Sequence, residues 1–138
     1  MSAFTARAGE PELLIQFVPG SHIEAVTEKL KAAINTHNFT FVRQQAIDSR
    51  MVPPDWEAAS IRIVYFCNFD KMDNALRQDK RAAQLMPCRI TLIEDSRGVN
   101  LIAVNPAWVS EQWNAPESHE KCLNLKHDYV AILEETAL

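Results

Sequence analysis

Two cysteines, each followed by a polar residue, are the side chains of this sequence best suited to chemistry. Cys67 and Asn68 stand where an expected strand gives way to an expected helix, and Cys88 and Arg89 stand where the next strand begins. The first amides of a helix and a nearby guanidinium both favour a thiolate, the reactive and metal-binding form of cysteine. These four residues are the candidate ligand or thiol site. The alternative is that both cysteines are small buried residues at strand ends.

Whether the two thiols can meet depends on the direction of the strands that carry them. If a right-handed crossover makes these strands parallel, Cys67 and Cys88 lie at opposite strand ends, about 20 Å apart over six residues. A return of the chain through residues 82–88 would instead allow an antiparallel arrangement, which brings them to the same end. The sequence leaves both arrangements open.

Other chemical signals in the chain are weaker. His119 and Cys122 share a helix face at i, i+3 spacing and could ligate a metal, but His127 does not follow on that face. A Gly-rich phosphate loop is excluded because the chain has only three glycines, and there is no serine nucleophile elbow. Trp108 and Trp113 could anchor a partner subunit or cover a sheet edge. No residue is assigned a catalytic role.

Hydrophobic periodicity and turn residues predict the elements that would position these side chains. The apolar run 13–18 predicts a strand that stops at Pro19. A helix is predicted over 22–35, behind a capping box of Ser21 and Glu24. Asn38 is expected in a left-handed or turn conformation after that helix. Further strands are predicted over 39–45, 61–66, 89–94 and 99–104, and further helices over 70–81 and 116–135.

The predicted order of elements is β-α-β-β-α-β-β-α, which belongs to the α+β class. Its layers imply a single antiparallel or mixed sheet with helices packed on one face. The other face must then meet solvent or be covered by a partner. Residues 1–12, which are small and polar and include Pro11, are expected to form a loose N-terminal segment, and residues 13–138 a single α+β domain.

Composition limits the classes of protein to which the chain can belong. Its 138 residues carry a formal net charge of -4, whereas a nucleic-acid binder needs a basic surface. No apolar run approaches the roughly 18 residues of a membrane span. The first residues lack the apolar stretch of a signal peptide, and three cysteines are too few for a disulfide scaffold. A cytoplasmic location is therefore expected.

The chain resembles the domain of unknown function 302 family over roughly residues 13–135. The resemblance rests on Cys67-Asn68, the helix after them, the run LMPCRITLIED over 85–95, Gly98 and Asn105-Pro106. The chain departs from the family pattern at Phe69, where the family has proline, and at Asn105, where it often has aspartate. The resemblance implies a TATA-binding-protein-like α+β fold, a tendency to dimerise and a link to thiol or sulfur chemistry. It implies no agreed activity and no DNA binding.

Because no catalytic constellation is present, the favoured hypothesis is a non-catalytic homodimeric binding module for a small molecule or a protein partner. Its site would lie near Cys67, Asn68, Cys88 and Arg89. The alternative is a thiol-based redox, sulfur-carrier or metal-binding protein that uses Cys67 and Cys88. A third hypothesis is a structural or regulatory interaction protein that uses Trp108, Trp113 and the last helix. The cofactor is unknown, and neither nucleic acid nor a membrane is expected as a partner.

Overall fold

The computed structural model describes residues 9–47, 49–55 and 60–138. Its strands are β1 (Leu13–Pro19), β2 (Thr40–Ala46), β3 (Ile61–Cys67), β4 (Cys88–Asp95) and β5 (Gly98–Val104). Its α-helices are α1 (Ile23–Thr36), α2 (Phe69–Gln78), α3 (Pro106–Ser110) and α4 (Pro116–Thr136). Short 3-10 helices are η1 (Ser49–Met51), η3 (Lys80–Leu85) and η4 (Glu111–Trp113). Within the described residues, no helix combines the length and the apolar character needed to cross a membrane.

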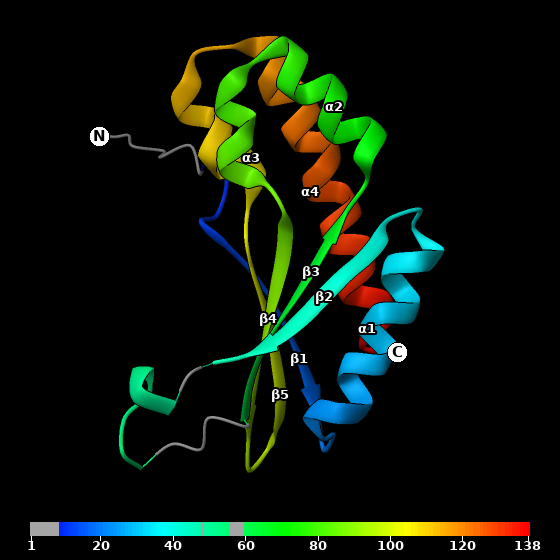
Figure 1. Ribbon diagram of the computed structural model, residues 1–138, viewed down its shortest axis with the longest axis vertical. Helices are drawn as coiled ribbons and strands as arrows, with labels where there is room; N and C mark the ends of the chain where they lie inside the picture. The colour runs from blue at the N-terminus through cyan, green and yellow to red at the C-terminus, as the bar shows by residue number, and fades with distance from the viewer. Residues whose placement is uncertain (1–8, 48, 56–59) are drawn as a thin grey trace, which may run out of the picture.

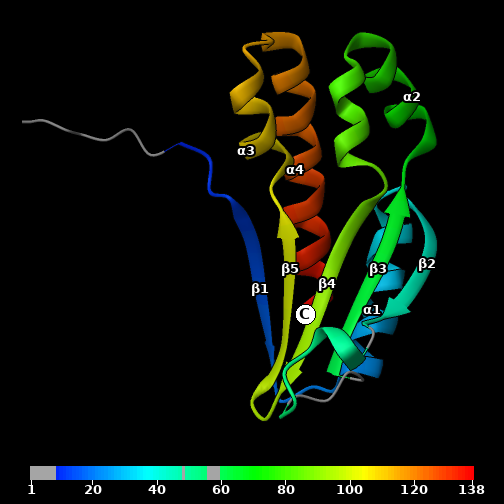
Figure 2. The ribbon, with the colours of Figure 1, turned by 60° about the vertical axis from the view of Figure 1, so that its left-hand side comes forward.

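The strands form one antiparallel sheet in the order β1-β5-β4-β3-β2, which confirms the predicted class and the single sheet. Helices α1 and α4 cover one face, and the opposite face, which we call the open face, is turned toward the viewer in Figure 2. Helix α2 with η3, and α3 with the first turns of α4, extend beyond the sheet at the top of Figure 1. We call this the upper end of the sheet; there β3 ends and β4 begins.

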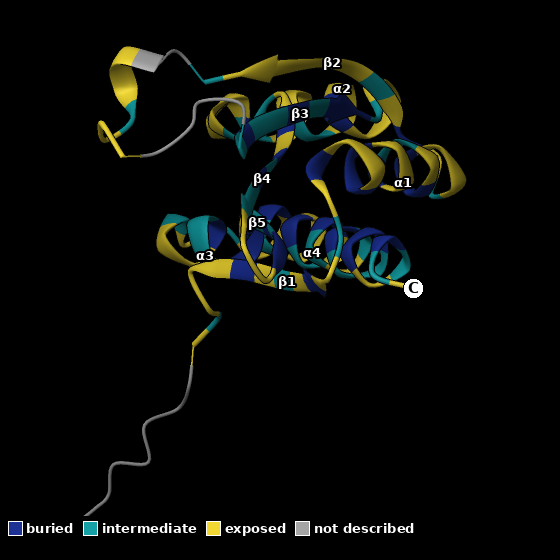
Figure 3. Cartoon of the chain, turned by 90° about the horizontal axis from the view of Figure 1, so that it is seen from below, coloured by how far each residue is buried: buried dark blue, intermediate teal, exposed yellow. Residues whose placement is uncertain are grey.

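The hydrophobic core lies between the sheet and the two long helices. Figure 3 shows buried stretches on α1 and α4, whereas the edge strands β1 and β2 are largely exposed. Helix α1 buries an apolar face at helical spacing, namely Ile23, Val26, Leu30, Ala33 and Ile34. Successive strand residues point to opposite sides of a sheet, so Val64 and Phe66 of β3 face this core together with Ile90 and Leu92 of β4. Each large apolar side chain buried in this way contributes about 1.5–3 kcal/mol.

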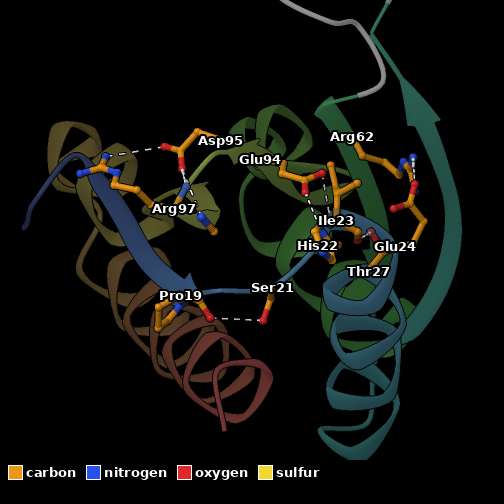
Figure 4. A network of polar contacts seen from close by, with 11 residues as sticks. Pro19, Ser21, His22, Ile23, Glu24, Thr27, Arg62, Glu94, Asp95 and Arg97 are labelled. Atoms are coloured by element: carbon orange, nitrogen blue, oxygen red, sulfur yellow. Dashed lines mark hydrogen bonds and ion pairs between the residues drawn. The ribbon is translucent and has the colours of Figure 1, made fainter.

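The start of α1 differs from the prediction, because the capping box is absent (Figure 4). The hydroxyl of Ser21 donates to a backbone carbonyl two residues earlier, and Glu24 does not serve as its partner. Glu94 of β4 takes over this role: its carboxylate accepts from the Ile23 backbone N–H at 3.4 Å and lies 3.0 Å from Nδ1 of His22. An acidic group from a distant strand thus supplies the negative charge that a helix start favours.

The chain after β5 also differs from the prediction. Asn105-Pro106 ends the strand as expected, but it also begins the short helix α3, whose N-cap is Asn105. The Asn105 side chain accepts a hydrogen bond from the Ala107 backbone N–H at 3.0 Å, and proline suits the first helical position. A helix of five residues is too short to produce a recognisable hydrophobic period, so the sequence pattern did not reveal it.

Asn105 also holds the beginning of the described chain. Its side-chain amide donates to Oε1 of Glu10 at 3.0 Å and to the carbonyl of Pro11 at 2.9 Å. Its backbone N–H donates to the carbonyl of Glu12 at 2.9 Å. The sequence predicts a loose segment over residues 1–12. Residues 1–8 lie outside the described residues, and these hydrogen bonds hold residues 10–12. Asn105 itself is fully buried, so its own polar groups depend on these partners for hydrogen bonding.

Replacing this asparagine tests its structural role. Asn105→Ala removes the cap of α3, which leaves the buried Ala107 backbone N–H without its partner, and it also removes the two side-chain bonds to Glu10 and Pro11, so we expect the free energy of unfolding to fall by about 2–4 kcal/mol. Urea denaturation followed by circular dichroism measures the change. Asn100→Ala, at a half-exposed position of β5, is the matched control and should shift stability by less than about 0.5 kcal/mol. Equal stability of the two variants would contradict the role given to Asn105.

Candidate functional site

The two cysteines of the candidate site lie at the same end of the sheet. In the antiparallel pair of β3 and β4, Phe66 faces Cys88, so Cys67 is one residue beyond the partner of Cys88. Of the two arrangements that the sequence left open, the structure therefore has the antiparallel one. Both thiols are free and buried.

Tyr129 of α4 lies at the centre of a cluster with all three cysteines. Its side chain forms a hydrogen bond with Cys88, and both Cys67 and Cys122 are near enough to raise its pKa further. Its ring also packs on Phe66, with the centroids 5.6 Å apart. The sequence offered one signal for this cluster, because Cys122 and Tyr129 are seven residues apart and so share a helix face.

Burial dominates the electrostatics of these thiols. It raises the pKa of Cys88 to about 11, only partly opposed by the hydrogen bond with Tyr129, and it also raises the pKa of Cys67. Arg89 does not oppose this effect, since adjacent strand residues point to opposite faces and its side chain is exposed while Cys88 is buried. The sequence suggested that the first amides of α2 and the Arg89 guanidinium would lower the pKa of these thiols. Burial has the larger effect, so both thiols are protonated at neutral pH.

Asn68 serves the backbone. Its side-chain oxygen caps α2 by accepting from the Lys71 backbone N–H at 3.0 Å. Its side-chain amide donates to the carbonyl of Asn38 at 3.0 Å. Asn38 has a positive φ of 65°, which matches the left-handed conformation expected after α1. Asn68 thus ties the start of α2 to the turn before β2.

Arg89, unlike the other three candidates, lines a pocket of about 330 Å³ at the upper end of the sheet. We call it the sheet-end pocket; its lining residues are Tyr65, Gln84, Leu85, Met86, Pro87, Arg89, Val104, Pro106, Val109 and Tyr129. Arg89 and Tyr65 are paired across β4 and β3, so their side chains are neighbours on the open face. Tyr129 connects this pocket to the buried Cys88.

Two cations flank Tyr65 at this pocket. The guanidinium carbon of Arg43 lies 4.9 Å from the centroid of the Tyr65 ring, and Arg89 lies beside Tyr65 on the other strand. Among the residues that the structure describes, no acidic side chain forms an ion pair with either arginine. The local charge is therefore positive, which attracts an anionic group.

His119 and Cys122, the candidate metal ligands, are linked through Ser110 of α3. Oγ of Ser110 lies 2.7 Å from Nδ1 of His119, and the same hydroxyl forms a hydrogen bond with Cys122. In the described part of the chain, no group of three or more histidine, cysteine, aspartate or glutamate residues is placed to hold a metal. The contacts of this pair thus join α3 to α4.

The two tryptophans of the candidate interface are both half-buried. Trp113 contacts Arg81 of η3, whose guanidinium carbon lies 5.0 Å from the ring centroid and whose Nη1 donates to the Trp113 carbonyl at 3.2 Å. Trp113 thus joins η4 to η3 within the chain. Trp108 lies in the first turn of α3, where its backbone N–H donates to the carbonyl of Asn105.

The raised pKa of Cys88 predicts a stability that depends on pH. From the ordinary pKa of 9.0 up to about 11, the unfolded chain releases this thiol proton while the folded chain keeps it. The free energy of unfolding should therefore be unaffected by Cys88 below pH 9 and should fall by up to about 1.4 kcal/mol per pH unit above it. Denaturation of the protein and of Cys88→Ala, measured from pH 7 upward, isolates this contribution. Parallel pH profiles of the two proteins would refute it.

Comparison with known proteins places the fold among solved structures. The structure is similar to "Crystal structure of uncharacterized conserved protein DUF302 from Bacillus stearothermophilus", with a TM-score of 0.80 and 13% sequence identity. The similarity covers 91% of this chain and 98% of that one. At this identity the likeness concerns the fold alone. No curated protein matches the chain significantly.

A family model matches the chain over residues 18–136, which include both cysteines of the candidate site. Its description is "Domain of unknown function DUF302". Since the match extends over most of the chain and agrees with the fold comparison, this protein belongs to the DUF302 family.

Proposed function

We propose that this protein is a non-catalytic homodimeric binding module, cytoplasmic in location, which takes a small anionic molecule in the sheet-end pocket. The observation that carries the proposal is the Arg89 guanidinium, which lines a partly apolar pocket and has no acidic partner among the described residues. A ligand carboxylate would supply that partner, because it can accept two parallel hydrogen bonds from a guanidinium.

The remaining lining defines the rest of the ligand. Leu85, Pro106 and Val109 offer apolar surface, and the Tyr65 ring offers a flat face. Gln84 adds an amide that can both donate and accept hydrogen bonds. A pocket that combines apolar walls with a few polar groups is typical of small-molecule sites. The preferred ligand is therefore a carboxylate on an apolar or aromatic body.

Dimerisation is proposed through the open face. Alternation along the strands places a group of apolar side chains there, namely Leu13, Ile15, Phe17, Ile63, Tyr65, Ile93, Ile102 and Val104. Ile15 is 60% exposed, and Leu13 and Val104 are each 42% exposed. A face of five strands, each seven or eight residues long, measures roughly 24 by 23 Å, so that two copies would bury roughly 1,100 Å², the minimum expected of a specific interface.

A second copy of the chain is the occupant that fits this face best. Tyr65 belongs both to the open face and to the sheet-end pocket, so the interface and the pocket are continuous. Two copies packed face to face bring the positive charges of Arg43 and Arg89 closer to the same two charges of the second copy. An anion bound at each Arg89 offsets that repulsion, so ligand binding and dimerisation support each other.

The alternative thiol function has less support. A redox, sulfur-carrier or metal-binding cysteine works as a thiolate, whereas burial raises the pKa of both Cys67 and Cys88. Neither cysteine lines the sheet-end pocket.

The first test concerns Arg89. Calorimetric titration with phenylacetate should show binding that the neutral phenylacetamide lacks, and Arg89→Gln should weaken the binding by about tenfold or more, because a charge-assisted bidentate contact is lost. Arg97→Gln, the same change in the turn between β4 and β5, is the matched control and should bind as the unmodified protein does. Equal binding of the acid and the amide would rule out an anion site at Arg89.

The second test concerns the open face. Sedimentation equilibrium at high micromolar concentration should give the mass of a dimer, and Ile15→Glu should give a monomer, since a carboxylate buried between two copies has no partner. Leu76→Glu, on α2 and away from the open face, replaces an exposed apolar side chain in the same way and should leave the dimer intact. A monomeric unmodified protein, or a dimer that survives Ile15→Glu, would eliminate this interface.

A further inference from the structure

A second pocket lies beneath the segment formed by α2 and η3, residues 69–85, which we call the arm. Its volume is about 320 Å³, and it separates the arm from α4. Its lining residues are Lys71, Met72, Asn74, Ala75, Ala82, Leu85, Lys121, Cys122, Asn124 and Leu125. With the sheet-end pocket it shares only Leu85. We call it the arm pocket.

The arm pocket exists because the arm is held at its two ends and packs loosely between them. At the base, Nζ of Lys71 lies 2.9 Å from Oδ2 of Asp128. At the tip, Gln78 donates to Glu117 at 2.6 Å. Between these contacts the arm turns small side chains, including Ala75, toward α4. The polar contacts therefore set the distance between arm and helix, and no large side chain fills the space.

The tip is fastened by further contacts to the chain that precedes and begins α4. The hydroxyl of Ser118 donates to Oδ2 of Asp79 at 3.3 Å, and Arg81 donates to the carbonyl of Trp113 at 3.2 Å. Arg81 also lies 2.7 Å from Oδ2 of Asp79, which fixes it in this position. These contacts keep the arm pocket in place without a ligand.

The walls and the rim of the pocket differ in chemistry. Met72, Ala82, Leu85 and Leu125 form apolar walls, to which Cys122 adds its protonated thiol, because burial raises the pKa of that thiol. The rim carries the side-chain amides of two asparagines and the ammonium groups of two lysines. The pocket thus offers an apolar interior and a cationic, hydrogen-bonding mouth.

The two lysines at the mouth are not equivalent. The charge of Lys71 is balanced by Asp128. Lys121 is exposed, and within the described residues it forms no ion pair with an acidic side chain. An anionic group at the mouth would pair with Lys121, while amides such as that of Asn124 could donate hydrogen bonds to the same group.

We propose that the arm pocket is a second small-molecule site, which takes a compact aliphatic carboxylate whose apolar chain lies between the arm and α4 and whose carboxylate pairs with Lys121. This site is independent of the sheet-end pocket, because Leu85 is the only residue that lines both. Its ligand also differs in shape, since the arm pocket has no aromatic side chain in its lining.

Calorimetric titration with octanoate and with octan-1-ol tests both parts of the proposal. Octanoate should bind, and octan-1-ol should bind about threefold to tenfold more weakly, because it fills the apolar walls but lacks the charge. Lys121→Gln should remove the preference for octanoate, whereas Lys80→Gln, at an exposed lysine of the arm that does not line the pocket, should preserve it. Equal binding of the acid and the alcohol to the unmodified protein would overturn the assignment of Lys121.

A second variant locates the site itself. Ala75→Trp places a large side chain in the arm pocket and should abolish octanoate binding while phenylacetate binding at Arg89 remains. In a two-dimensional amide NMR spectrum of the unmodified protein, octanoate should shift signals of the arm and of residues 121–125. Repeating the titration with Arg89→Gln separates the two sites, because octanoate binding should be unchanged in that variant. Absence of octanoate binding, or its loss with Arg89→Gln, would overturn the arm pocket as a separate site.

Discussion

The antiparallel pairing of β3 with β4 is the constraint on which both pockets depend. Because neighbouring antiparallel strands connect at one end, the chain between Cys67 and Cys88 must leave the sheet and return to the same place. That chain is the arm, and it therefore extends beyond the sheet, where it meets α4 and not the core face (Figures 1 and 2). The sheet-end pocket and the arm pocket lie on either side of Leu85, near the point where the arm returns.

The residues that carry the family resemblance have mainly structural contacts in this chain. Cys67 and Cys88 are buried around Tyr129, Asn68 caps α2, and Asn105 caps α3 and holds the chain before β1. A thiol in such surroundings keeps its proton, since the thiolate would lose its hydration without gaining a cation. Arg89 is the exception, because strand alternation turns it away from the core and into the wall of the sheet-end pocket.

In the described part of the chain, this fold leaves apolar side chains without a packing partner in two places. The open face is an uncovered surface, and the arm encloses a pocket. The helices α1 and α4 cover one side of the sheet, and the described elements place no long helix on the other (Figure 2). The arm, by contrast, is fixed to α4 by polar contacts at its ends, and its alanines are too small to fill the gap. A partner copy suits a wide flat surface, whereas a small molecule suits an enclosed gap.

The sequence by itself determined the elements whose residues are close along the chain. Period and turn chemistry predicted the strands, the long helices and the left-handed Asn38, because those signals arise within a few residues. Tertiary structure decided what depends on distant residues. Glu94 replaced the predicted capping box across 71 residues of chain, and the antiparallel pairing of β3 with β4 placed the two cysteines at the same end of the sheet. The two pockets were also decided by tertiary structure. Their walls come from segments that are distant in the sequence, and the packing of those segments, not the local sequence pattern, sets the distance between them.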